Sequence, residues 1–417
     1  MSRILHTGFI LFALTSMIWA GDTHSPKRPS REVFSDLRAR QTDYAGPGRE
    51  KNPSADVNEV LIGYFGPGGP SDPRAEPAPS LSRGDMWNAA CLAVEQANLA
   101  GGYNGLPFRL VAGWSDNPWG SGVKEVTRMA YMHKVWAIIG GIDGPSTHLA
   151  EQVVAKARLT LINPASTDKT VNLANVPWMF SCLPADHLQA PVLARAIASE
   201  VGKKSFLLVS AVDHDSRLFT VELTGSFIQY KLSPSYHFEF KPGQGNYNEL
   251  AEEIVRAGSH ALVLIAADTE SARIISAVRE RGFKGVIYGG PCMGRRSFVE
   301  QAGDAAEGVV FPLLYTHGKG SDIFNEKFAA RFGRQPDYLA AHTYDAVNLL
   351  IAAIRKAGLN RVRIYDEVRA LSPWQGITGE IRWDPLGSNS RPVSLGTIRG
   401  GSVQKLLREK TSDTNCD

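Results

Sequence analysis

The chain has 417 residues, of which 43% are hydrophobic and 21% charged, a composition that fits a globular protein and excludes disordered and membrane-embedded classes. Two folded units are the natural expectation for this length. The net charge is only +3, and the Lys and Arg residues are scattered without interleaved aromatic residues, so no nucleic acid partner is predicted.

The N-terminus has the pattern of an export signal. Arg3 stands before an apolar stretch, Ile4 to Trp19, that is too short and too interrupted to span a membrane comfortably. Cleavage after Ala20 predicts a signal peptide over residues 1–20 and a periplasmic location. Ile18 is untypical of a cleavage site, which leaves an uncleaved anchor as the alternative. Residues 21–57 are polar and rich in Pro and Gly, as in a linker.

Alternating strands and helices begin at Val60 and fill the first half of the chain. Val60 to Phe65 is a continuous apolar run stopped by Gly66-Pro67, which predicts a buried strand. Similar runs predict strands over 108–114, 135–139 and 160–162. Apolar residues at helical spacing predict helices over 85–98, 122–134 and 146–157.

The same alternation restarts after residue 180. Strands are expected over 205–209, 236–240, 261–265, 285–288 and 308–310, and helices over 188–201, 217–230, 247–257 and 271–281. The C-terminal part predicts helices over 324–331 and 338–357, then a hairpin-like pair of strands at 379–383 and 394–398. Strands without polar alternation, separated by helices, indicate parallel sheets covered on both faces. The fold class is therefore α/β, with two doubly wound parallel-sheet lobes.

Two turns are candidates for binding an anion. Gly140 to Thr147 and Asn163 to Asp168 each follow an expected strand and carry Ser or Thr hydroxyls where a helix begins. Ligands of open α/β sheets bind beyond the carboxyl ends of the strands, where backbone N–H groups and hydroxyls hold a carboxylate. Ordinary connecting loops with helix caps would have the same local sequence.

Motifs for catalysis, metals and cofactors give little support to an enzyme. Ser166 to Lys169 and Ser121 to Lys124 match S-x-x-K, and Ser115 to Asn117 is S-D-N, but the order is wrong and no K-T-G follows. The ten His residues are dispersed, so no catalytic residue, metal site or cofactor is expected. The four cysteines are widely spaced. The sequence allows one disulfide but does not indicate which two cysteines would form it, and Cys91 is expected to be a buried free thiol.

Several stretches, in the correct order, resemble one family. Ala97 to Gly105 is similar to its "IN..GGi.G" pattern, Tyr344 to Val347 to "YDAv", and Gly376 to Gly387 to "G.tG.i.fd..G", alongside the two turns described above. Over about residues 58–403 the chain resembles the type I periplasmic solute-binding proteins of ABC importers, in the leucine/isoleucine/valine-binding branch.

The resemblance implies a periplasmic binding protein-like type I fold with a three-crossover hinge. The crossovers are expected near Cys182, Pro312 and Pro373. Lobe 1 is then 58–183 plus 312–373, lobe 2 is 184–311 plus 374–403, and 404–417 is a tail. The implied function is capture of a small amino acid, amide or aromatic acid by a monomer that closes around it and contacts an inner-membrane ABC permease. A sensor of the same fold is the alternative.

In lobe 1, the family pattern places ligand contacts on two turns and one helix. Ser146 and Thr147, within about two residues, match the pair that receives the ligand carboxylate. The backbone of Ala165 and the hydroxyl of Thr167 match the groups that hold the α-carboxylate and the α-ammonium. Trp87 matches the residue that contacts the apolar part of the ligand, or else packs in the core.

In lobe 2, this chain departs from the family pattern. Asp215 stands where amino acid binders have a Tyr, Asp268 lies near a second expected Tyr, and Cys292 lies where the acidic partner of the ammonium is expected. Asp215 or Asp268 would then pair with the ammonium instead, although both positions also suit helix caps. The departures leave the choice of solute open.

Overall fold

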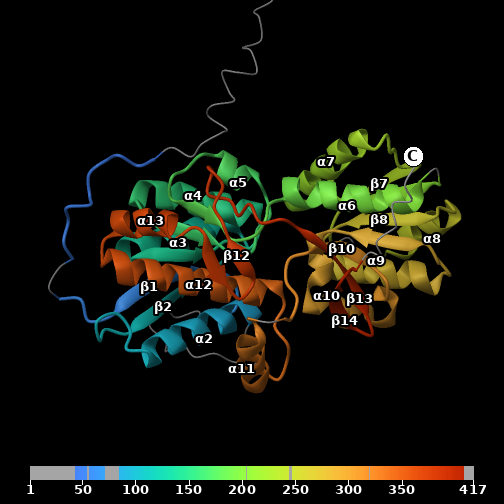
Figure 1. Ribbon diagram of the computed structural model, residues 1–417. Coiled ribbons are helices and arrows are strands. Elements are labelled where there is room, and N and C mark those ends of the chain that lie inside the picture. The colour runs from blue at the N-terminus through green and yellow to red at the C-terminus, as the bar shows by residue number, and fades with distance from the viewer. Residues whose placement is uncertain are drawn as a thin grey trace, which may run out of the picture.

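The computed structural model describes residues 43–53, 56–70, 84–202, 204–243, 247–318 and 320–407. They form two α/β lobes side by side, between which the described chain crosses three times (Figure 1). The expected signal peptide, residues 21–42 of the expected linker, and residues 408–417 of the expected tail lie outside this part of the chain. Within it, no helix is both long and apolar enough to cross a membrane.

Lobe 1 is built on a five-stranded parallel sheet in the order β2-β1-β3-β4-β5. Its strands are β1 Val60–Phe65, β2 Phe108–Gly113, β3 Ala137–Gly140, β4 Thr160–Asn163 and β5 Met179–Ser181. Its helices are α2 Asp85–Leu99, α3 Val123–Thr127, α4 Gly144–Ala157, α5 Thr170–Leu173, α11 Asp322–Phe332, α12 Tyr338–Ala357 and α13 Arg361–Ala370, with π-helical turns at Pro118–Gly122 and Arg128–Met132.

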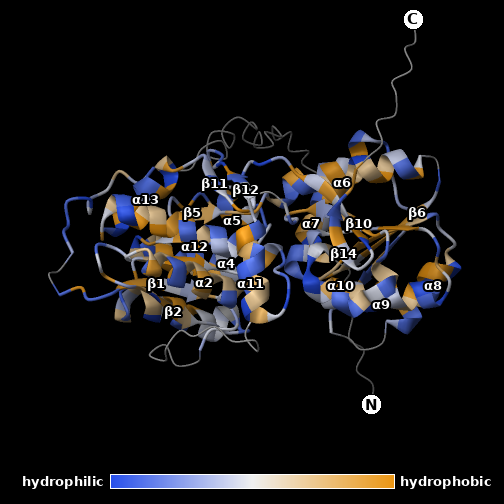
Figure 2. Cartoon of the chain, turned by 60° about the horizontal axis from the view of Figure 1, so that its bottom comes forward, coloured by the Kyte–Doolittle hydropathy of each residue, from blue (hydrophilic) through white to orange (hydrophobic). Residues whose placement is uncertain are grey.

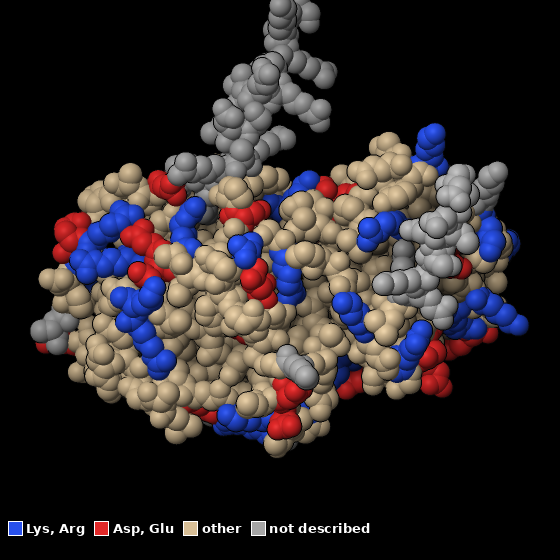
Figure 3. Space-filling view, in the orientation of Figure 1, with Lys and Arg blue, Asp and Glu red and all other residues tan. Residues whose placement is uncertain are grey.

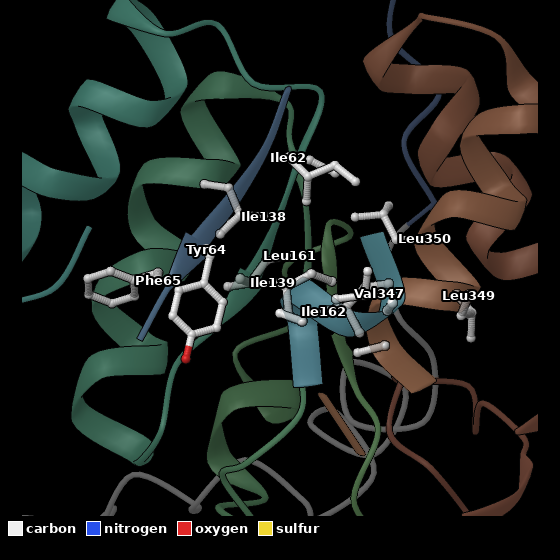
Figure 4. Packing of buried hydrophobic residues seen from close by; sticks show 14 of the residues in the cluster. Ile62, Tyr64, Phe65, Ile138, Ile139, Leu161, Ile162, Val347, Leu349 and Leu350 are labelled. Carbon is white, nitrogen blue, oxygen red and sulfur yellow. The ribbon is translucent and has the colours of Figure 1, made fainter. Parts of the chain in front are cut away.

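The core of lobe 1 joins both parts of the chain that form this lobe. Ile139 of β3 and Ile162 of β4 belong to the same buried cluster as Val347 and Leu350 of α12 (Figure 4). Helix α12 also packs along α2. Helix α12, from the second half of the chain, therefore packs on a sheet whose strands all come from the first half.

Lobe 2 repeats the same topology. Its five parallel strands lie in the order β7-β6-β8-β9-β10, which is again the second, first, third, fourth and fifth in chain order, and β13 and β14 extend the sheet antiparallel. The strands are β6 Phe206–Ala211, β7 Tyr236–Phe240, β8 Ala261–Ile265, β9 Val286–Gly289, β10 Val310–Leu313, β13 Ser394–Arg399 and β14 Ser402–Lys405. The helices are α6 Asp186–Val201, α7 His214–Gln229, α8 Asn248–Arg256, α9 Asp268–Glu280 and α10 Arg296–Ala302, with 3-10 turns at Pro291–Gly294 and Gly303–Ala306.

Helices cover both faces of the lobe 2 sheet, as the apolar strands predict. Along β6, Phe206 and Leu208 join the cluster under α6 and α7, whereas Leu207 and Val209 join the cluster under α8, α9 and α10. Alternate residues of a strand point to opposite faces, so a strand buried on both sides is apolar throughout. Figure 2 shows the apolar colour concentrated on strands and on inner helix faces. On the face in Figure 3, positive and negative side chains are interspersed.

The C-terminal part differs from the sequence prediction. Strand β12, Gly379–Ile381, pairs with β11, Trp374–Gly376, and not with residues 394–398, which pair with β10 and β14. The predicted hairpin is therefore wrong. Ile381 lies in the core of lobe 1, so the third crossover comes after this residue and not near Pro373. Helix α13, capped by Asn360, was not among the expected helices.

Part of the expected linker is attached to lobe 1. The ring of Tyr44 packs against Trp178, and Arg49 forms an ion pair with Asp366 of α13. The side-chain amide of Asn360 donates to backbone carbonyls of this segment. Residues 43–53 are thus a packed extension of lobe 1, because their aromatic and charged side chains find partners there.

Candidate functional site

A cavity of about 310 Å³ lies between the lobes at the carboxyl ends of their strands. Lobe 1 contributes the loops after β3 and β4 and the start of α12, and lobe 2 contributes the loops after β6, β8 and β9. Open parallel sheets bind ligands at this edge. The lining residues are Ile142, Asp143, Ala165, Ser166, Thr167, Asp213, Asp215, Ser216, Phe219, Ile265, Ala266, Ala267, Asp268, Gly290, Pro291, Cys292, Arg295, Tyr338 and Leu339.

On the lobe 1 wall, the loop after β4 is held by Asn163. Its Oδ1 accepts hydrogen bonds from the backbone N–H groups of Ala165 and Ser166, at 2.7 and 2.9 Å. The N–H of Ala165 is therefore already used within the loop. The half-buried Thr167 lies at the cavity, and its backbone carbonyl accepts from the N–H of Asp186 at 2.9 Å. Burial raises the pKa of the Asp186 carboxyl well above its usual value.

On the lobe 2 wall, two carboxylates lie at the start of α7. Asp213 caps the helix, because its Oδ1 accepts from the N–H of Ser216 at 3.0 Å. Its Oδ2 is buried and has no hydrogen-bond donor among the described residues. Asp215, one residue into α7, accepts from the N–H of Gly144 in lobe 1 at 3.0 Å. The start of α7 thus presents two carboxylate acceptors: Asp213 Oδ2, which has no donor among the described residues, and Asp215, whose bond to Gly144 a ligand could replace.

The loops after β8 and β9 complete this wall. Asp268, at the start of α9, accepts from the N–H of Thr269 at 3.0 Å and from the hydroxyl of Ser297. The Cys292 thiol donates to the carbonyl of Ala266 at 2.9 Å, and burial raises its pKa to about 12. Cys292 is therefore a neutral thiol that contributes no charge to the cavity.

The charged groups of the cavity are predominantly acidic. Four carboxylates line it, from Asp143, Asp213, Asp215 and Asp268, against the single guanidinium of Arg295. Arg295 is neutralised by Asp337, whose Oδ2 lies 2.5 Å from its Nε. Burial, and then the nearby Asp143, raise the pKa of Asp215 to about 7. This environment favours a cationic group as a ligand.

The lobes are in contact around the cavity. Lys169 of lobe 1 pairs with Glu222 of α7, and Asp85 of α2 pairs with Arg296 of α10 at 2.9 Å. The pair between Arg295 and Asp337 also joins the two lobes. Together with the bond between Gly144 and Asp215, these contacts hold the two lobes against each other beside the cavity.

The structure brings five of the eight sequence-predicted residues to the cavity. They are Ala165, Thr167, Asp215, Asp268 and Cys292.

Three predicted residues lie elsewhere. Trp87 is completely buried in lobe 1, with its ring edge on Tyr64, so it packs in the core. Ser146 is also buried, and its hydroxyl accepts from the N–H of Ile142 in a capping box with Asp143. The Thr147 hydroxyl donates to the carbonyl of Asp143 at 2.7 Å. Both hydroxyls stabilise the turn, since the capping geometry points them into it.

Sequence reasoning missed four residues that shape the cavity. The sequence does contain a signal for Asp213, because an Asp just before a helix, three residues ahead of Ser216, is typical of a helix N-cap. Phe219 lies less than two turns further along α7 and supplies an aromatic wall. Arg295 precedes α10 in lobe 2, and Tyr338, 43 residues further along the chain, is the first residue of α12 in lobe 1. No local sequence pattern predicts that these two residues lie close together.

The remaining motifs have structural explanations. Lys169 pairs with Glu222, and the Ser166 hydroxyl accepts from the N–H of Asp168, so this S-x-x-K match has no nucleophile–base arrangement. Among the described residues, Cys91, Cys182 and Cys292 form no disulfide, and Cys416 lies outside this part of the chain. Outside the cavity, His148, Asp168 and His214 bring three metal-ligand atoms together, although the dispersed His residues led us to expect no such group.

Known proteins resemble this chain along most of its length. A family model described as periplasmic binding protein matches residues 72–402. An amino acid binding protein of Pseudomonas aeruginosa is 23% identical over 337 residues, which cover 79% of this chain and 87% of that protein. A leucine-, isoleucine-, valine-, threonine- and alanine-binding protein of the same organism is 22% identical over 317 residues, covering 74% and 83%.

Two solved structures show the same fold. One is the substrate-binding protein of a Streptococcus pneumoniae branched-chain amino acid transporter in complex with isoleucine, with a TM-score of 0.73 and 21% identity, covering 84% of this chain and 100% of that one. The other is a solute-binding protein of an R. palustris ABC transporter in complex with benzoate, with a TM-score of 0.72 and 14% identity, covering 84% and 95%.

Proposed function

Because the chain belongs to the periplasmic binding protein family, we propose that it captures one small amino acid between its lobes and delivers it to the permease of an ABC importer. Members of this family bind solutes and are not enzymes. The observation that carries the proposal is the cavity of about 310 Å³ between the lobes, whose charged lining groups are mainly acidic. Ligand cavities in proteins start at about this size, so the solute is small.

The acidic lining supports a solute with an ammonium group. Asp213 offers a buried carboxylate oxygen without a donor among the described residues, and Asp215 lies two residues away. A buried carboxylate gains from a charge-assisted hydrogen bond to a cation. Benzoate, the ligand of one relative of this fold, has no such cation. We therefore place amino acids ahead of aromatic acids and amides.

The carboxylate of the solute would use lobe 1. Gly144 is not itself a lining residue, but its N–H, at the N-terminus of α4, donates to Asp215, which lines the cavity. This N–H and the hydroxyl of Thr167, on the neighbouring loop, are the anion donors of our proposal. In our proposal the solute carboxylate takes over the N–H of Gly144, and Asp215 turns to the ammonium. The apolar part of the solute would lie against Phe219, Ile265 and neighbouring lining residues.

A set of matched solutes tests this proposal. Leucine carries both charges, 4-methylpentanoate lacks the ammonium, and isoamylamine lacks the carboxylate. We expect leucine or another small zwitterion to raise the melting temperature, with about 2.7 kcal/mol of stabilisation at 100 times Kd. The two singly charged analogues should bind far more weakly. If 4-methylpentanoate or benzoate bound best, the ammonium assignment would be wrong; if no small solute bound, the proposed function would fail.

The proposal includes location and partners. Export through residues 1–20 would place a monomer in the periplasm, where its closed form contacts an inner-membrane permease. N-terminal sequencing of the exported protein tests cleavage after Ala20, and retention of the apolar stretch would contradict it. Sedimentation with and without solute tests whether the protein is a monomer.

A further inference from the structure

A group of three side chains with metal-binding atoms lies where the two lobes meet, beside the cavity and not in its lining. His148 comes from α4 and Asp168 from the loop after β4, both in lobe 1, whereas His214 is the first residue of α7 in lobe 2. One ligand atom from each residue lies within 4.8 Å of the others. The group exists only when α4 and α7 approach each other.

The two imidazoles are directed at one carboxylate oxygen. Nε2 of His214 lies 2.9 Å and Nε2 of His148 lies 3.5 Å from the same Oδ2 of Asp168. The other oxygen, Oδ1, accepts from the N–H and the hydroxyl of Thr170, each at 2.7 Å, which fixes the carboxylate plane. Two imidazole nitrogens and one carboxylate oxygen are a common ligand set for Zn²⁺.

A second carboxylate lies behind His148, in the arrangement of known metal sites. Nδ1 of His148 is 3.3 Å from Oε2 of Glu151, one helical turn along α4. Glu151 is only 2% exposed, and its Oε1 has no hydrogen-bond partner among the described residues. Histidines that bind metals usually give their other nitrogen to a carboxylate, which orients the ring. Burial of a carboxylate that holds only one imidazole is otherwise costly.

The backbone also leaves room for this group. A Cβ at position 144 would lie 2.5 Å from Oδ2 of Asp168 and 2.7 Å from Cδ2 of His214. Only glycine at this position lets the start of α4 approach both side chains. The absence of a side chain at Gly144 thus permits the convergence.

We propose that His148, Asp168 and His214 bind one Zn²⁺ ion that links lobe 1 to lobe 2. The ion is bound by Nε2 of each histidine and by Oδ2 of Asp168, and a water molecule takes the fourth position of a tetrahedral site. The Nε2 atom of His148 exchanges its present contact with Thr170 Oγ1, at 2.8 Å, for the metal. Because its ligands come from both lobes, the ion stabilises the closed arrangement and not an open one.

Zn²⁺ binding to the EDTA-treated chain without solute tests the site directly. We expect one ion per chain by equilibrium dialysis. His214→Ala removes a half-exposed side chain, so the variant should fold, and it should bind Zn²⁺ about 100-fold more weakly or worse, at least the loss seen for outer-shell partners. Glu151→Gln should weaken binding by about 10- to 100-fold. His260→Ala, which removes a partly exposed histidine beside Glu200 in lobe 2, is the matched control.

Two further readouts locate the ion and its effect. X-ray absorption at the zinc edge should show nitrogen and oxygen ligands at about 2.0–2.2 Å with two imidazoles. Small-angle scattering should show that Zn²⁺ makes the parent chain more compact but leaves His214→Ala unchanged. The proposal is overturned if no ion binds, or if His148→Ala, Asp168→Asn and His214→Ala all bind Zn²⁺ as tightly as the parent.

Zn²⁺ and the solute should also favour each other, a consequence that rests on the proposed function. Both would stabilise the same closed form, so each should raise the affinity of the other by the same factor. Zn²⁺ binding in the absence of solute does not depend on this coupling. Failure of the solute proposal is therefore distinguishable from failure of the metal site.

Discussion

The carboxylate of Asp215, in lobe 2, accepts a hydrogen bond at 3.0 Å from the backbone N–H of Gly144, the first residue of α4 in lobe 1. A helix N-terminus favours a negative charge, and here the protein itself supplies that charge from the opposite lobe. In our proposal, closure and ligand binding use this same donor. A solute carboxylate that binds this N–H has to displace Asp215, which frees an acidic group for the ammonium.

Asp215→Asn tests this exchange. The variant keeps the shape of the side chain but removes the charge that would pair with the ammonium. We expect its affinity for the amino acid to fall by about 1.5–3 kcal/mol, roughly 10- to 150-fold, as for a lost hydrogen bond between charged groups. Isothermal titration measures the change, and Asp304→Asn, at an exposed position of lobe 2, is the control. Unchanged or tighter binding would show that Asp215 does not contact the ammonium.

Substitutions of Phe219 and Trp87 should have different effects, the first on solute affinity and the second on the stability of the fold. Phe219 lines the cavity, so Phe219→Ala should weaken binding of an apolar amino acid by about 1–3 kcal/mol. Trp87 is buried in the core of lobe 1, so Trp87→Phe should lower the free energy of unfolding by about 1–3 kcal/mol and leave solute affinity within about twofold. Titration and chemical denaturation of both variants provide the comparison. If folded Trp87→Phe protein bound the solute much more weakly than the parent, Trp87 would have to contribute to the binding site.

Patterns along the chain predict this fold better than they predict the site. Continuous apolar runs such as Val60–Phe65 predict buried parallel strands because both faces of each sheet are covered. The turns after β3 and β4 were also located correctly. Within a turn, however, the direction of a side chain depends on capping: Asp143 holds Ser146 and Thr147 inside the α4 turn. Spacing identifies the turn but not which of its atoms face the cavity.

Contacts between the lobes could not be predicted. Arg295 pairs with Asp337, and His214 with Asp168, over separations of 42 and 46 residues. These pairs depend on how two separately folded sheets face each other. The same limit explains the misplaced third crossover, because only packing assigns Ile381 to lobe 1.

Asp345 should be essential for the stability of lobe 1. Its carboxylate accepts hydrogen bonds from the N–H groups of Ile377 and Thr378, each at 2.9 Å, and from the Thr378 hydroxyl at 2.6 Å. These bonds join α12 to the turn between β11 and β12. Asp345→Ala leaves three half-buried donors without this acceptor, so it should cost about 3 kcal/mol of unfolding free energy.

Urea denaturation of Asp345→Ala checks this cost. The exposed Glu326→Ala on α11 is the control and should change stability by less than about 0.5 kcal/mol. Gly376→Ala should be destabilising for the same reason, because a Cβ there would overlap the Asp345 carboxylate. A parent-like midpoint for Asp345→Ala would mean that this turn is held by other contacts.

His342 should make lobe 1 sensitive to acid. It is completely buried in α12, where its Nδ1 lies 2.8 Å from the carbonyl of Tyr338, and burial lowers its pKa from the ordinary 6.5 to about 3. Between these two values the unfolded chain binds a proton that the folded chain does not. Stability contributed by the neutral ring is therefore present above pH 6.5 and is lost as pH falls toward 3, by up to about 1.4 kcal/mol per pH unit.

His342→Leu removes this titration. The variant should be less stable near neutral pH, since the hydrogen bond to Tyr338 is lost, but its stability should fall less steeply between pH 6.5 and pH 3. Burial raises the pKa of the nearby Asp345 to about 6, which makes stability fall as pH rises from about 4 to 6, so the parent curve alone mixes opposite slopes. The difference between the stability curves of parent and variant isolates the contribution of His342 to the pH dependence. The partly exposed His260→Ala is the control for loss of a histidine. Parallel curves for His342→Leu and the parent would mean that this ring becomes protonated inside the folded lobe at its ordinary pKa.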